Sequence, residues 1–125
     1  IEIDERLYND ANAKFAQNEK ITILRGDSGE VLPALLANIT EPTLFWLDGH
    51  YSGGTTGKGT LDTPIHQELE TIFLHPQNRH VILVDDARLS TGKNDYPTYT
   101  EVETLARQYD YSAKKKGDII ILRHL

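Results

Sequence analysis

Two apolar segments of this chain stop abruptly at aspartate. Residues 45–47 lead into Asp48, and residues 81–84 lead into Asp85 and Asp86. Apolar runs of this kind are typical of strands that are buried on both faces of a parallel sheet, and such sheets bind ligands at the carboxyl ends of their strands. We therefore expect the three carboxylates to crowd one rim of a sheet, where a cation or a shared proton would offset their repulsion.

The chemistry open to this cluster is oxygen chemistry. Carboxylates favour Mg²⁺ or a similar divalent cation over zinc, and the absence of cysteine excludes thiol catalysis, disulfides and Cys-ligated zinc. A purely structural arrangement is the alternative, because an aspartate after a strand is commonly a turn or capping residue. His50 lies beside the cluster, and its imidazole suits a general base near neutral pH; a metal ligand and a solvated loop residue are the other roles open to it.

A scaffold of alternating strands and helices is predicted to position these residues. Apolar periodicity and turn residues indicate strands at residues 1–3, 21–24, 43–47 and 80–84, helices at residues 5–17, 30–38, 64–75 and 100–108, and a terminal antiparallel hairpin at residues 109–113 and 119–122. This order predicts an α/β fold, a three-layer sandwich with a mostly parallel sheet and right-handed crossovers. The 125 residues suffice for a single domain with one core.

Local sequence signals refine this prediction. Ser28 is expected to cap the second helix, and Thr63 followed by Pro64 is a strong signal for the start of the third. A glycine-rich loop at residues 51–59 is either a mobile lid over the strand ends or a plain flexible loop. It lacks the first glycine and the final Ser or Thr of a phosphate-binding loop, which argues against nucleoside triphosphate binding.

The charge and hydropathy of the chain limit its partners. A formal net charge of −6 argues against duplex DNA or an anionic membrane surface, because both need clustered basic residues. No apolar run approaches the ~18 residues of a membrane-spanning helix, and no secretory signal is visible. We expect a cytoplasmic protein that acts on a small-molecule substrate, with homo-oligomer formation left open. Because the first residues look like the end of a strand, we also expect a segment upstream of Ile1.

Four short motifs carry a family resemblance, in this order along the chain: Glu2-Ile3-Asp4, Gly26-Asp27-Ser28, Leu47-Asp48-Gly49-His50 and Val84-Asp85-Asp86. With them the chain resembles the class I S-adenosylmethionine-dependent methyltransferases, and more narrowly the metal-dependent O-methyltransferases that act on sugars and on catechol-type hydroxyls. The resemblance extends from the second strand of that Rossmann-like fold to its terminal hairpin. The family's first strand and the glycine-rich turn after it have no counterpart here, so the expected domain is an N-terminally truncated one.

The resemblance implies a site for S-adenosylmethionine. Glu2, with Ile3 beside it, would hold the cofactor ribose, as acidic residues at such strand ends do in nucleotide-binding α/β folds. Asp27 and Ser28 would lie by the adenine, and Asp48 would face the same crevice.

The resemblance also implies the catalytic chemistry. Asp48, Asp85 and Asp86 would bind Mg²⁺, and His50 would act with Asp48 on the acceptor hydroxyl, with His50 as the base. The implied reaction is in-line methyl transfer from sulfonium to oxygen, in which the metal lowers the pKa of the hydroxyl and the protein positions the reactants. The segments 51–61 and 87–99 are expected to line the acceptor pocket.

Two other functions remain open. The chain would be a non-catalytic Rossmann-like module if a partner chain supplied the absent strand, and an exposed strand edge at residues 1–3 would recruit such a partner. A metal-dependent hydrolase built on the same carboxylates is the other alternative. Phosphatases with an aspartyl nucleophile need Asp-x-Asp at the end of the first strand, where this chain has Glu2-Ile3-Asp4.

Overall fold

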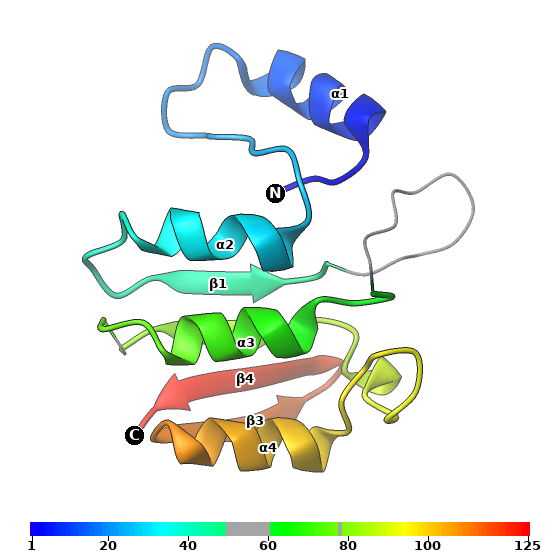
Figure 1. The fold of residues 1–125 in the computed structure, drawn as a ribbon, viewed down its shortest axis with the longest axis vertical. Helices are drawn as coiled ribbons and strands as arrows, with labels where there is room; N and C mark the ends of the chain where they lie inside the picture. Colours follow the sequence, from blue (N-terminus) through cyan, green and yellow to red (C-terminus); the bar gives the residue numbers. More distant parts are fainter. Residues whose placement is uncertain (50–60, 78) are drawn as a thin grey trace.

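The computed structural model describes residues 1–49, 61–77 and 79–125 of this α/β protein (Figure 1). Its sheet has the strand order β1-β2-β4-β3. None of the described helices is long and apolar enough to cross a membrane. The four strands of the sheet are β1 (Leu44–Leu47), β2 (Val81–Val84), β3 (Tyr111–Lys116) and β4 (Ile119–His124).

The sheet is mixed rather than mostly parallel. β1 and β2 run parallel, whereas β4 is antiparallel to both β2 and β3. The parallel pair is joined by a crossover through α3 (Ile65–Phe73), as parallel neighbours require. β3 and β4 form the hairpin predicted from the sequence, and Gly117 in its turn has a φ of 61°, a conformation that suits glycine.

Three helices cover one face of the sheet: α2 (Ser28–Leu36), α3, and α4 (Tyr99–Gln108) (Figure 1). Alternate strand residues point into this layer and meet the apolar stripes of the helices. The resulting core includes Leu32, Phe45, Leu69, Ile72, Ile82, Val102, Tyr111, Ile120 and Leu122. Because all three helices start near the same end of the sheet, their first turns surround the carboxyl ends of β1 and β2 (Figure 1).

The opposite face of the sheet is open at β1. Leu44 is 63 % exposed and Trp46 is 53 % exposed, although both side chains are large and apolar. α1 (Glu5–Phe15) contributes no buried residue. The described residues therefore bury one layer of helices against the sheet.

The two N-terminal strands expected at residues 1–3 and 21–24 do not form. A single parallel bridge joins Glu2 to Arg25 in their place. Two short strands with no further neighbour are marginal in water, and Asp4 caps α1 directly after the bridge, which turns the chain away. The bridge still holds Glu2 against the turn that begins α2.

The capping residues of two helices differ from the expected ones by one position. Asp27, not Ser28, caps α2 by accepting a hydrogen bond from Gly29 N at 2.9 Å, so Ser28 is the first helical residue. Aspartate caps a helix as well as serine does, and Asp27 has the extended backbone conformation that a cap needs. Pro64 occupies the N-cap position of α3 instead of its first turn, and Thr63 lies one residue further out.

Candidate functional site

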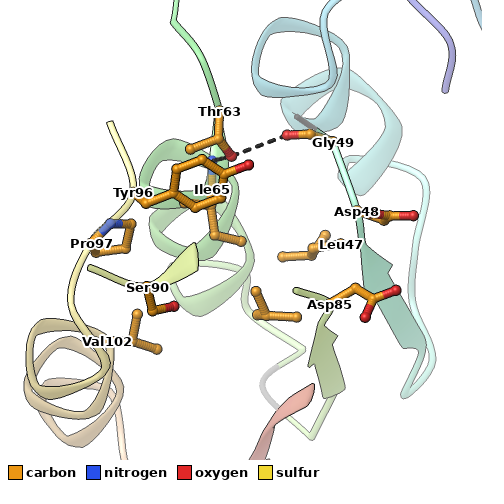
Figure 2. A pocket seen from close by; sticks show the side chains of 11 residues that line it. Leu47, Asp48, Gly49, Thr63, Ile65, Asp85, Ser90, Tyr96, Pro97 and Val102 are labelled. Atoms are coloured by element: carbon orange, nitrogen blue, oxygen red, sulfur yellow. Dashed lines mark hydrogen bonds between the residues drawn. The ribbon is translucent and has the colours of Figure 1, made fainter. Parts of the chain in front are cut away.

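The carboxyl ends of β1 and β2 bring Asp48 and Asp85 together. Leu47 and Val84 are direct partners in the parallel ladder, and Asp85 N donates a hydrogen bond to Leu47 O at 3.0 Å. The two aspartates follow these partners and line one pocket at this end of the sheet (Figure 2). The structure thus joins two of the three carboxylates that the sequence places at this rim.

The pocket combines an apolar inner wall with a polar rim. Buried side chains from two strands and two helices form the inner wall: Leu47, Val84, Ile65 and Val102. The segment between β2 and α4 closes another side with Ser90, Tyr96 and Pro97 (Figure 2). Three residues of the segment 87–99 thus line a pocket beside the strand ends, and binding of an acceptor there stays a prediction.

Thr63 fixes the start of α3 to the end of β1. Its hydroxyl donates a hydrogen bond to Gly49 O at 3.1 Å (Figure 2) and accepts one from Ile65 N at 3.4 Å. The residue is 3 % exposed. The sequence identified Thr63 only as a signal for the start of a helix. Its role at the site depends on the hydrogen bond to Gly49, which is distant in the sequence.

Tyr96 faces the rim as an uncharged phenol. Burial raises the pKa of Tyr96 to about 12, and the negative charges of Asp86, Asp48 and Asp62 add to this rise, while Arg88 opposes it. The phenol therefore keeps its proton at physiological pH and can donate a hydrogen bond, but it cannot serve as a general base there.

Asp86 is held away from the pocket by a cation. It adopts a left-handed backbone with a φ of 54° before the short 3-10 helix Ala87–Leu89. Its carboxylate accepts a hydrogen bond from Arg88 Nη1 at 2.6 Å, and Arg88 also pairs with Asp118 of the hairpin turn. Asp86 is not among the residues that line the pocket.

The remaining pair, Asp48 and Asp85, has the donor chemistry of a hard-cation site. Mg²⁺ is commonly held by one or two protein carboxylates and completes its shell with water and substrate oxygens. Within residues 1–49, 61–77 and 79–125, no group of three or more His, Cys, Asp or Glu side chains is arranged to hold a metal ion. Asp86 would have to release Arg88 to join the pair. The residues present fit a two-carboxylate site.

The residues expected at the cofactor form a second cluster around the start of α2. Gly26 N donates a hydrogen bond to Glu2 O at 3.0 Å, which places Glu2 and the partly buried Ile3 next to the turn that contains Asp27. Glu2 Oε1 accepts a hydrogen bond from Asp4 N at 2.8 Å. The Asp27 carboxylate is engaged as the cap of α2.

Gly49 connects the two clusters. A Cβ atom on Gly49 would lie 3.1 Å from Ser28 Oγ and 3.5 Å from Glu68 Oε1, so the end of β1 packs directly against the start of α2. The Ser28 hydroxyl is hydrogen-bonded to Glu68, which is only 3 % exposed. Burial is the main cause that raises the pKa of the Glu68 carboxyl above its ordinary value.

Sequence analysis missed Glu68, although its position carried a signal. It lies three residues after Ile65 and four before Ile72, on the stripe of α3 that faces the core. A carboxylate on such a stripe is unusual unless it is paired or functional.

The proposed base His50 and the glycine-rich loop at residues 51–59 lie outside the described residues. Comparison with known proteins gives no further assignment: no family model, no curated protein and no solved structure matches this chain.

Proposed function

We propose that this chain belongs to an S-adenosylmethionine-dependent, Mg²⁺-assisted O-methyltransferase that acts on a hydroxyl of a small molecule or sugar. The observation that carries the proposal is the pair of carboxylates, Asp48 and Asp85, at the ends of two parallel strands and on the rim of one pocket. Open α/β sheets bind their ligands at this edge. The proposed scaffold is the Rossmann-like, three-layer sandwich of that enzyme class.

The cofactor is proposed to lie between the Glu2 bridge and the start of α2. Glu2 and Ile3 would contact the ribose, and Asp27 and Ser28 would flank the adenine. Asp48 would face both the cofactor and the metal, because Gly49 beside it packs against Ser28. The support for this arrangement is that residues from three distant parts of the sequence meet at the start of α2.

The proposed chemistry assigns distinct tasks to the residues of the rim. Bound by Asp48 and Asp85, Mg²⁺ would lower the pKa of the acceptor hydroxyl. Tyr96, which keeps its proton, would donate a hydrogen bond to an oxygen of the acceptor and orient it. The apolar inner wall would keep water from the reacting atoms, and the sequence-based candidate for the base is His50.

The direct test is methyl transfer from S-adenosylmethionine labelled at its methyl group. The protein is incubated with Mg²⁺ and separate panels of catechols and sugars, and labelled methyl ethers are detected by mass spectrometry. We expect product from the wild-type protein and none from Asp85→Asn, with Asp10→Asn on the exposed surface of α1 as a matched control. Product formation that is independent of Mg²⁺ and unaffected by Asp85→Asn would contradict the proposal.

A second candidate is a binding module that a partner copy completes. It is favoured by β1, which is an edge strand of the described sheet and carries the exposed Leu44 and Trp46. Trp46 is the sole tryptophan of the chain, so its fluorescence reports on this face alone. A dimer by sedimentation, with a blue shift of Trp46 emission as concentration rises, would support the module; a monomer with water-exposed emission at all concentrations would exclude a partner copy.

A further inference from the structure

The segment between β2 and α4 presents Tyr96 to the pocket from an unusual turn. Asn94 and Asp95 have φ values of 52° and 64°, in the left-handed region that few residues other than glycine adopt. Tyr96 N donates a hydrogen bond to Lys93 O at 3.0 Å, which closes a turn with these two residues at its centre. Asparagine and aspartate tolerate this conformation best, but it persists only where surrounding contacts hold it.

The Asp95 carboxylate makes such a contact. Its Oδ2 accepts a hydrogen bond at 2.8 Å from Asp62 N, which is distant in the sequence. Bonds from a backbone N–H to a carboxylate belong to the stronger class of hydrogen bonds. Asp62 precedes Thr63, whose hydroxyl donates to Gly49 O at the end of β1. The short segment before α3 is therefore bound to β1 on one side and to the turn of Asp95 on the other.

This link lies beside the wall of the pocket. Thr63 and Tyr96, the next residues in sequence after the two linked ones, both line the pocket (Figure 2). They also line an outer groove between α3 and the segment before α4, to which Asp95 contributes as well. The negative charge of Asp62 is among the causes that raise the pKa of Tyr96, which agrees with a phenol close to the segment before α3.

The chain after Tyr96 is fixed by its own sequence. Pro97 follows directly, and a residue that precedes proline is restricted to extended conformations. Thr98 then caps α4 in a capping box with Glu101. The freedom that remains to Tyr96 therefore depends on the turn before it, which the Asp95 carboxylate holds.

We propose that Asp95 is a positioning residue that holds the Tyr96 phenol at the pocket by binding the turn at residues 93–96 to the segment before α3. The inference rests on the proposed function, in which Tyr96 orients the acceptor through a hydrogen bond. Asp95 is not among the described residues that line the pocket itself. Its effect on the acceptor should therefore pass through the phenol.

The first test observes Tyr96 by fluorine NMR of protein that contains fluorotyrosine, with the signal assigned by its loss in Tyr96→Phe. Asp95→Gly removes the carboxylate and adopts a positive φ freely, so it should move the Tyr96 signal toward its position in the unfolded protein. Asp95→Asn keeps an oxygen that can accept the bond and should leave the signal near its wild-type position. Asp110→Gly is the matched control, because Asp110 is also exposed and has a φ of 60°.

The second test is a double-mutant cycle on the KM for the acceptor in the methyl-transfer assay. Asp95→Gly should raise this KM by about three- to tenfold, as expected when one hydrogen bond is lost, and Asp95→Asn should retain most of the wild-type value. In a Tyr96→Phe background the phenol hydroxyl is absent, so adding Asp95→Gly should change KM by less than about twofold.

The outcomes separate this inference from the proposed function. If the wild-type protein transfers no methyl group, the proposed function fails, and the fluorine signal still decides whether Asp95 holds Tyr96. An unchanged signal in folded Asp95→Gly, or additive effects of the two substitutions on KM, overturns the role of Asp95 while methyl transfer stands. Failure of Asp95→Gly to fold, as judged by circular dichroism, also overturns it, because an exposed hydrogen bond that positions one side chain should leave the core unchanged.

Discussion

Asp48 and Asp85 leave neighbouring parallel strands at the same level, because the residues before them, Leu47 and Val84, are direct partners in the ladder. Parallel strands that end at the same level present the residues that follow them at one edge of the sheet, where open α/β sheets bind ligands. The pocket that the two aspartates share, rather than the presence of either residue, makes this rim the candidate site.

Asp85→Asn is predicted to remove the response of the protein to Mg²⁺. A ligand present at a hundred times its Kd adds about 2.7 kcal/mol to the free energy of unfolding, so Mg²⁺ should raise the Tm of the wild-type protein. The variant keeps the shape of the side chain but loses one of the two carboxylates, and it should fold normally without that rise. Thermal unfolding with and without Mg²⁺ measures both. A variant that fails to fold would show that Asp85 is structural, and a folded variant that keeps the full Mg²⁺ shift would show that Asp85 does not bind the ion.

Thr63→Val is predicted to destabilise the fold by about 1 kcal/mol, because it removes the hydrogen bond from the buried hydroxyl to Gly49 O. It should also weaken binding of S-adenosylhomocysteine, since Gly49 packs against Ser28. Denaturant unfolding and calorimetry report the two effects. Thr63→Ser keeps the hydroxyl and should retain most of the stability. A loss in Thr63→Ser as large as that in Thr63→Val would show that the hydrogen bond is not the main contribution of Thr63.

His80 is predicted to make the protein sensitive to acid. The side chain is 1 % exposed, its Nδ1 accepts a hydrogen bond from Thr43 N at 3.0 Å, and its Nε2 lies 3.1 Å from His75 Nδ1. Burial, and then the charge of His75, lowers the pKa of His80 below its ordinary 6.5. The unfolded chain therefore takes up more protons as the pH falls below that value, so this contribution to stability is present above pH 6.5 and is lost on acidification.

Denaturant unfolding at a series of pH values between 7.5 and about 5 checks the prediction for His80. His80→Gln should show a shallower loss of stability than the wild-type protein over this range. His66→Gln, at an exposed position on α3, should leave the profile unchanged. Parallel profiles for wild type and His80→Gln would mean that another group causes the acid sensitivity.

Glu68 is predicted to make the protein less stable as the pH rises, which is the opposite of the effect of His80. Burial raises the pKa of the Glu68 carboxyl, the hydrogen bond from Ser28 opposes the rise, the charge of Asp27 adds to it, and the α-amino group of Ile1 opposes it. Above the ordinary value of 4.5 the folded state keeps a proton that the unfolded chain has lost, so stability falls as the pH rises from 4.5 through the raised pKa. Glu68→Gln is neutral throughout and should remove this component of the pH profile. A variant profile that still declines over that window would contradict the prediction.

Strand pairing explains why part of the fold could be predicted from the sequence. The runs that form β1 and β2 are apolar throughout and end at Asp, which indicates both a buried strand and its last residue. Residues 21–24 have strand-like composition as well, but a strand also needs a neighbour to complete its hydrogen bonds. Among the described residues, the pairing of this segment with residues 1–3 amounts to a single bridge between Glu2 and Arg25, so composition alone gave the wrong element there.

The parts of the site that were not predicted depend on contacts between distant segments. Asp86 was expected at the metal, but Arg88, which the hairpin residue Asp118 also contacts, holds its carboxylate. The spacing of α3 places Glu68 on its core-facing stripe, but the contact with Ser28 appears only when α2 packs against this helix. Periodicity describes each helix by itself, and neither contact is visible at that level.

The most direct test of the central claim is calorimetric titration of S-adenosylhomocysteine into this chain, with and without Mg²⁺. We predict binding in the micromolar range, about −8 kcal/mol, and a loss of affinity in a Ser28→Ala, Asp27→Asn double variant that retains its circular dichroism spectrum. Absence of binding by the folded wild-type protein, in both the presence and the absence of Mg²⁺, would contradict the proposal that this cofactor binds at the start of α2.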